Sequence, residues 1–263
     1  ASDVYKRQVM EMFSAYEFDR ENWDSDFAKI AEKNGLHGIS KDQMADEIEH
    51  AKNKHKEALG LLFMVPGSKM IFQGDAYGEI NPFRFTREQA TDEPNIEREK
   101  GYNFDESFQK SKIDPENHTV GGIFKLSQAM SDLVKRNPAL QDVQGMEYLD
   151  AMTPLVDEQN KVMAIKRFDL NGNEVVALYN FGDRPLENYG LNNPMAVLNN
   201  GGQWKETINS NDTQFDGTGA YQNDGTYCAN NGEVRLNIPA NGFVVLEKVD
   251  GNGNVEKGQP RFS

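Results

Sequence analysis

The sequence is poor in several features that would assign a class of protein by themselves. It has one cysteine, Cys228, so a disulfide framework within the chain is excluded, although the cellular compartment stays open. No apolar run approaches the roughly 18–20 residues that cross a bilayer, and we find no internal repeat. It has four histidines, and the closest pair, His50 and His55, misses the i, i+4 spacing of a helical metal site. We therefore expect no membrane span and no metal centre in this chain.

Basic residues are also in short supply. The chain has 28 lysines and arginines against 42 aspartates and glutamates, which gives a net charge of −14. The acidic residues are spread along the chain, and such a surface repels phosphate, which argues against a nucleic-acid partner. The hydrophobic content of 37% is low for a single well-filled α/β domain. With 263 residues, the chain has room for one large or two ordinary domains.

The stretch around the turn Pro66-Gly67 is the most informative part of the chain. An apolar helix precedes this turn, and residues 69–72 form an apolar run too short to alternate. Such a run is typical of a strand covered on both faces, as in a parallel α/β sheet or barrel. In these folds the active site lies just beyond the carboxyl ends of the strands. The residues in that position are Gln73, Gly74, Asp75, Tyr77 and Gly78. A tight polar turn after a core strand is the alternative, and it stays open.

Helical patterns lie on both sides of this stretch. Ser40 with Gln43 forms a capping box, which predicts a helix that runs toward Met64. We predict that its inward face contains Met44, Ile48, Ala51, His55, Ala58 and Leu62. Residues 119–136 form a second predicted helix, which Asn137-Pro138 ends. Its predicted inward residues are Ile123, Leu126, Met130, Leu133 and Val134. The charged, irregular residues 84–117 are interpreted as an insertion.

From about residue 153 the pattern becomes that of antiparallel β-structure. Residues 161–168 and 174–181 flank Asp169-Leu-Asn-Gly-Asn173 and predict a hairpin. Further short strands are predicted at residues 196–199, 205–209, 233–238 and 243–249. We therefore expect a β-sandwich at 153–249, followed by a polar tail at 250–263. The hairpin turn imitates the start of a calcium loop, but an Asn-Gly turn explains it better because the glycine is misplaced and no glutamate closes the loop.

Three motifs resemble one family. Residues 63–78 read Phe-Met-x-Pro-Gly-x-x-Met-Ile-Phe-Gln-Gly-Asp-x-x-Gly, which resembles the eighth strand and following loop of the α-amylase family of glycoside hydrolases and transglycosylases. Arg-Asn-Pro-Ala-Leu at 136–140 resembles the end of that family's last barrel helix, and residues 238–246 resemble the strand that closes its domain C. The resemblance implies α/β plus all-β architecture: the C-terminal portion of a (β/α)8 TIM barrel at 9–152, then an antiparallel β-sandwich, domain C, at 153–249.

The resemblance also implies roles for particular residues. Family members are retaining enzymes, and their nucleophile and general acid precede the part of the barrel that this chain resembles. A third family carboxylate lies in a His-Asp motif, whose local match puts Asp19 in the catalytic position as a transition-state stabiliser. Phe18 stands where the family has histidine, and phenylalanine cannot donate a hydrogen bond. Trp23 is a candidate stacking platform for a sugar. The candidate substrate-binding residues of the loop are Gln73, Asp75 and Tyr77. A surface acid at Asp19, a core tryptophan at Trp23 and a loop cap at Asp75 are the alternatives.

The expected function is that of a fragment of an α-glucan-acting hydrolase or transglycosylase of α-amylase, pullulanase or branching-enzyme type. The alternative is a non-catalytic α-amylase-like binding or assembly protein, which Phe18 favours. We expect an α-glucan partner, neither nucleic acid nor membrane, and no cofactor in this chain, although a structural calcium fits the missing part of the parent. Residues 1–8 match a translated sequencing adapter, so we expect a metagenomic fragment with its true N-terminus missing, and localisation is not predicted.

Overall fold

The computed structural model describes residues 41–71, 74–78, 121–141, 152–191, 198, 202–228 and 234–255. The chain divides into two compact units, Ala1–Lys52 with Ile71–Phe124 and Asn53–Met70 with Lys125–Ser263. The predicted site residues Asp19, Trp23 and Gln73, together with Phe18 and the insertion at 84–117, lie outside the described residues. None of the described helices is long and apolar enough to cross a membrane.

Two long helices form where the sequence predicts them. Helix α3 spans Lys41–Met64 and follows the predicted capping box. Helix α4 spans Gly121–Arg136, and a short 3-10 turn, η4 (Pro138–Leu140), follows it. The side chain of Asn137 accepts a hydrogen bond from the backbone N–H of Ala139, 3.1 Å away, which caps this turn. The predicted end of the second helix at Asn137-Pro138 is confirmed.

Over residues 51–64, the buried face of α3 is not the predicted one, and the side chains of Met44 and Ile48 lie outside the described residues. Ala58 is exposed, and His55 and Leu62 are only half-buried. Among the described side chains of this helix, the buried ones are Lys52, Lys56, Glu57, Leu59, Gly60, Phe63 and Met64. The prediction was wrong there because it counted only apolar side chains, whereas Lys56 is buried with carbonyl groups of other elements as its acceptors. For α4, burial of Ile123, Leu126, Met130 and Leu133 is confirmed, and Val134 is half-buried.

The apolar run after α3 is not a strand where it is described. Lys69, Met70 and Ile71 have irregular backbone, and Met70 is 85% exposed. A strand needs a neighbouring strand to pair its backbone groups, and no strand among the described residues pairs with this segment. The predicted strand at 69–72 is therefore wrong over 69–71. In the described part of the chain, no strand precedes Met152, so the barrel portion is not evident there.

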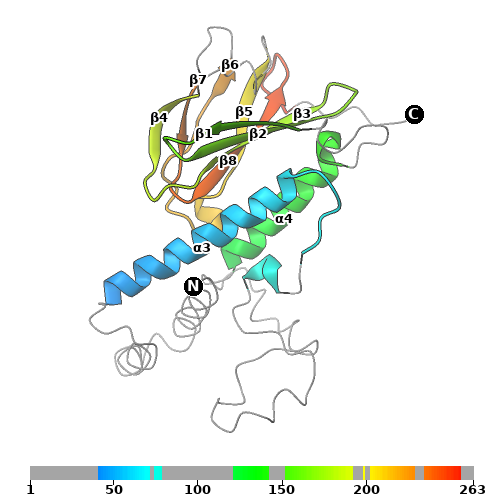
Figure 1. Cartoon of the computed structure of the whole chain (residues 1–263). Coiled ribbons are helices and arrows are strands. Elements are labelled where there is room, and N and C mark those ends of the chain that lie inside the picture. The colour runs from blue at the N-terminus through cyan, green and yellow to red at the C-terminus, as the bar shows by residue number, and fades with distance from the viewer. Residues whose placement is uncertain are drawn as a thin grey trace, which may run out of the picture. The chain divides into compact units, whose positions relative to one another are not determined.

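Two antiparallel sheets form the second half of the chain (Figure 1). The six-stranded sheet has the order β1-β2-β3-β8-β5-β6, and β4 pairs with β7 in a two-stranded sheet. The strands are β1 (Met152–Asp157), β2 (Val162–Phe168), β3 (Glu174–Asn180), β4 (Leu186–Leu191), β5 (Gln203–Asn209), β6 (Thr226–Cys228), β7 (Val234–Ile238) and β8 (Gly242–Val249). The hairpin of β2 and β3 is confirmed, as are the strands near 205–209, 233–238 and 243–249. The strands β1, β4 and β6 were not predicted.

The core lies between the two sheets. It contains Val162, Ala164, Val176, Leu178, Leu198, Trp204, Val234, Leu236, Ile238, Val244 and Leu246. Every residue of β3 is buried. Alternate residues of this strand enter the core, and the residues between them are buried on its other face. The opposite face of β3 and β8 carries Tyr179 and Phe243, whose stacked rings are 5.4 Å apart. Phe243 packs directly against Gly60 of α3, so this helix covers the second face of the sheet.

The chain after β8 turns back on itself. Asp250 accepts hydrogen bonds at Oδ1 from the backbone N–H groups of Asn252 and Asn254, both 2.9 Å away. Val255 then forms an isolated bridge with Val249. The first residues of the predicted polar tail are thus folded. The predicted strand at 196–199 lies outside the described residues except for Leu198, which is buried in the core.

Candidate functional site

Two of the predicted substrate-binding residues lie in one short turn. Asp75 and Tyr77 belong to the 3-10 turn η1 (Asp75–Tyr77), which is flanked by Gly74 at φ 99° and Gly78 at φ 68°. Both glycines have left-handed backbone, which other residues rarely adopt. A Cβ atom on Gly78 would lie 2.8 Å from Cδ1 of Ile123, a buried residue in the first turn of α4. The turn therefore has a tightly specified conformation.

The side chains of this turn differ in exposure. Tyr77 is 7% exposed, so its ring is part of the packing, and Asp75 is half-buried. The backbone carbonyl of Asp75 accepts from the N–H of Gly78 at 3.2 Å and closes the turn. Within the described ranges, no group of three or more His, Cys, Asp and Glu residues could hold a metal ion. Substrate binding by Asp75 and Tyr77 stays a prediction, as do the roles of Asp19, Trp23 and Gln73.

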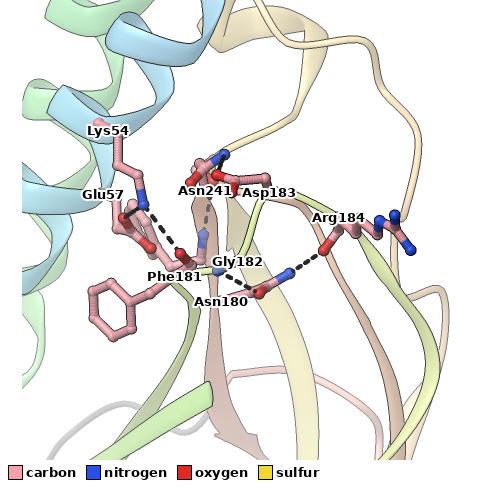
Figure 2. A network of polar contacts seen from close by, with 10 residues as sticks. Lys54, Glu57, Asn180, Phe181, Gly182, Asp183, Arg184 and Asn241 are labelled. Atoms are coloured by element: carbon pink, nitrogen blue, oxygen red, sulfur yellow. Dashed lines mark hydrogen bonds and ion pairs between the residues drawn. The ribbon is translucent and has the colours of Figure 1, made fainter. Parts of the chain in front are cut away.

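A polar network connects α3 with the loop after β3 (Figure 2). Lys54 Nζ donates to Oε2 of Glu57 at 3.4 Å and to the backbone carbonyl of Phe181 at 3.2 Å. The Asn180 side chain accepts from the N–H of Gly182 at 3.0 Å and donates to the carbonyl of Arg184 at 2.8 Å. These bonds hold the start of the β3–β4 loop in one conformation beside the helix.

The same loop is also held from the turn before β8. The backbone N–H of Asn241 donates to the carbonyl of Gly182 at 3.0 Å, and its side chain donates to Oδ1 of Asp183 at 3.3 Å. Asn241 has φ 46°, a left-handed conformation that asparagine tolerates better than most residues. Helix α3, the β3–β4 loop and the β7–β8 turn therefore meet in one hydrogen-bonded cluster.

Glu57 is the most perturbed acid of this cluster. Its side chain is 4% exposed, and among the described residues its Oε1 atom has no hydrogen-bond partner. Burial raises the pKa of Glu57 from 4.5 to about 7, although the charge and hydrogen bond of Lys54 oppose the rise. The hydroxyl of Tyr179 on β3 is likewise buried without a partner in this part of the structure. Its pKa lies well above the usual 10.0, first because of burial and then because of the charge of Glu57.

The C-terminal ends of both helices bind side chains of the six-stranded sheet. Arg167 of β2 is buried and donates from Nη1 to the carbonyl of Met64, the last residue of α3, at 2.9 Å. Arg136, the last residue of α4, forms an ion pair with the buried Glu247 of β8. A cation at a helix C-terminus satisfies carbonyl groups that the helix leaves unpaired. Both contacts attach the end of a helix to the sheet.

A buried lysine strengthens the attachment of α3. Lys56 is 1% exposed, and its Nζ donates to the carbonyls of Ser210 and Phe215, at 3.3 Å and 3.2 Å. Sequence reasoning missed Lys56, Glu57, Arg167 and Glu247 as positioning residues. No local signal marks them, because charged residues at these spacings are typical of a solvated surface, and the partners of Lys56, Arg167 and Glu247 lie more than 100 positions away.

A further polar cluster is a charged ladder across three strands. Glu174 of β3 pairs with Lys166 of β2 at 2.6 Å and with Lys248 of β8 at 2.7 Å. Burial alone would raise the pKa of Glu174, but the hydrogen bonds and charges of the two lysines outweigh it and lower the pKa below 4.5. The ladder supports the sheet and has the character of a structural ion pair.

The two sheets define the class of this part of the chain, an antiparallel all-β sandwich. Residues 155–249 match the family model described as "Alpha amylase, C-terminal all-beta domain". The family resemblance of the sequence is therefore confirmed for residues 155–249.

Curated relatives extend the comparison to α-glucan-acting enzymes. The 1,4-alpha-glucan branching enzyme GlgB of Mycolicibacterium paratuberculosis is 25% identical over 193 residues, which cover 66% of this chain and 22% of that protein. The branching enzyme GlgB of Cutibacterium acnes is 24% identical over 172 residues, covering 64% and 22%. The chain therefore spans about a fifth of the length of these relatives.

Solved structures give a weaker likeness. The pullulanase SAP of Group B Streptococcus has a TM-score of 0.48 at 14% identity, over 80% of this chain and 30% of that one. A pullulanase from Anoxybacillus sp. LM18-11, complexed with maltotetraose, has a TM-score of 0.45 at 13% identity, over 82% and 25%.

Proposed function

We propose that this chain is the C-terminal portion of an α-glucan-acting enzyme of the α-amylase family, a hydrolase or transglycosylase of α-amylase, pullulanase or branching-enzyme type. The observation that carries the proposal is the α-amylase C-terminal all-β domain at residues 155–249, preceded by the family's motif at 63–78. The branching enzymes that resemble the chain match about two thirds of it, and each is several times longer.

In this proposal, residues 9–152 are the last portion of a (β/α)8 barrel. The irregular backbone at 69–71 fits a barrel strand that has no paired strand among the described residues, because an unpaired strand has no partner for its N–H and C=O groups. Asp19 would stabilise the charge that develops in the transition state, and Gln73, Asp75, Tyr77 and Trp23 would contact the sugar. No cofactor enters the proposed chemistry of this chain.

The sandwich has a mechanical role in the proposed parent. Arg167 binds the last carbonyl of α3, and the candidate loop with Asp75 begins only a few residues further along the chain. Glu247 of β8 pairs with Arg136, the last residue of α4, and so attaches this helix to the same sheet. We expect loss of either contact to weaken the attachment of its helix to the sandwich.

The test compares the chain with its full-length parent, obtained by recovering the upstream gene sequence. The parent should carry a carboxylate nucleophile and an acid at the ends of earlier strands and should act on amylose, pullulan or glycogen. The present chain should release no reducing sugar and form no branches, because it lacks both groups. Sustained release by the pure chain above a no-protein control would refute the fragment assignment. A parent without the two carboxylates would instead support the non-catalytic alternative that Phe18 favours.

A further inference from the structure

The contact between α3 and the sandwich contains an acid that a structural role does not require. Glu57 lies three residues before Gly60, so both residues are on the same face of the helix. That face packs against Phe243, and the ring of Phe243 stacks on Tyr179. An acidic side chain is thus buried beside aromatic rings. A glutamine or methionine would fill the same space without the cost of a buried charge.

The charged and titratable groups of the surrounding elements offer little compensation. They are Lys54 and Lys56 on α3, Tyr179 on β3, Asp183 and Arg184 after β3, and Lys161 before β2. In the described region, the cation that pairs with Glu57 is Lys54, whose Nζ lies 3.4 Å from Oε2 of Glu57. Lys54 also donates a hydrogen bond to the carbonyl of Phe181. Lys56 donates to Ser210 and Phe215 instead.

We propose that Glu57 makes the packing of α3 on the sandwich depend on proton binding. With the carboxyl group neutral, the helix packs against β3 and the network of Figure 2 is complete. When the carboxylate ionises, its unpartnered oxygen carries buried charge, and the Asn53–Met64 part of the helix separates more often from the sheet. This device is independent of the proposed enzymatic function, since it uses only contacts within one compact unit.

The direction follows from proton linkage. Glu57 has a pKa of about 7 in the folded protein, raised by burial from its ordinary 4.5. The closed helix therefore binds a proton that the open helix releases between these two pH values. The contact between helix and sheet has its full stability below the ordinary pKa of 4.5, and this stability is lost as the pH rises through the folded pKa of about 7. One linked proton changes the opening equilibrium by up to about tenfold per pH unit, on the order of 10²-fold over the window.

The experiment is hydrogen exchange on the full chain between pH 5 and 8, corrected for the intrinsic pH dependence of exchange. We expect the opening constant for amides at 53–64 to rise on the order of 10²-fold, while amides of β7 change little. Glu57→Gln should remove this pH dependence. Glu49→Gln on the same helix is the matched control, because Glu49 is 49% exposed, and it should retain the wild-type dependence.

Two results would overturn the proposal. One is a pH-independent opening constant for α3 in the wild-type chain, and the other is an unchanged pH dependence in Glu57→Gln. Because that variant could fail to fold, carbon-13 NMR titration of the Glu57 carboxyl in the wild-type protein gives a second answer. A midpoint near 7 is expected, and a midpoint near 4.5 would refute the proposal.

Discussion

Gly60 is the point of closest approach between α3 and the six-stranded sheet, and its replacement by alanine gives a sharp test of the packing. A Cβ atom at this position would lie 2.4, 2.5 and 2.8 Å from three carbons of the Phe243 ring. Carbon atoms in contact normally lie about 3.5–4.0 Å apart, so the shortest contact is more than about 1 Å too close. The ring has nowhere to move, because Phe243 is fully buried and stacked on Tyr179.

Two effects of opposite sign decide the outcome of Gly60→Ala. Alanine favours the helix over glycine by about 0.8–1.0 kcal/mol. Overpacking a tight core costs about 1–3 kcal/mol, and here the strain falls on a buried ring. We expect the second effect to be larger, so the variant should lose up to about 2 kcal/mol of unfolding free energy. Urea unfolding of the full chain, followed by far-UV circular dichroism, measures this difference.

A second substitution separates packing from helix propensity. Phe243→Leu removes the ring, so Gly60→Ala should cost less in that background and should approach the gain that propensity alone predicts. Ala58→Gly, at an exposed position of the same helix, reports the propensity effect and should cost about 0.5–1 kcal/mol. If Gly60→Ala stabilises the protein by about 1 kcal/mol in the presence of Phe243, the close approach of helix and sheet is wrong.

Two further predictions concern the polar groups of the sheet. Arg167→Met should lower the free energy of unfolding in urea by about 1–3 kcal/mol, because the buried carbonyl of Met64 loses its donor. The control Arg184→Met, at an exposed position, should change it by no more than about 0.5 kcal/mol. Equal effects of the two variants would contradict the role of Arg167. Glu174 has a lowered pKa, so its contribution to stability is present above its ordinary 4.5 and is lost as the pH falls through the folded value. Glu174→Gln should therefore reduce the loss of stability in acid, and an unchanged acid dependence would argue against the ladder.

Much of the local structure could be predicted because its causes are local. The capping box at Ser40 and Gln43 predicts the start of α3, and Asn137-Pro138 predicts the end of α4. Local hydrogen bonds also stabilise the Asn-Gly turn between β2 and β3. Asp169 Oδ1 accepts from the backbone N–H groups of Asn171 and Asn173, at 2.9 and 3.0 Å. Neighbouring residues supply all of these interactions. A motif in one stretch of sequence is therefore sufficient to predict them, and it was sufficient to indicate the family.

The tertiary structure decided which side chains are buried and what they bind. Lys56 and Glu57 look like surface residues in the sequence, yet both are buried, since Ser210, Phe215 and Tyr179 come from strands and turns far along the chain. The segment at 69–71 shows the converse, for it has the apolar pattern of a core strand but no described strand pairs with it. Burial of Lys56 depends on carbonyl groups from distant parts of the chain, and a strand forms only when another strand pairs with it. Neither condition can be read from local periodicity.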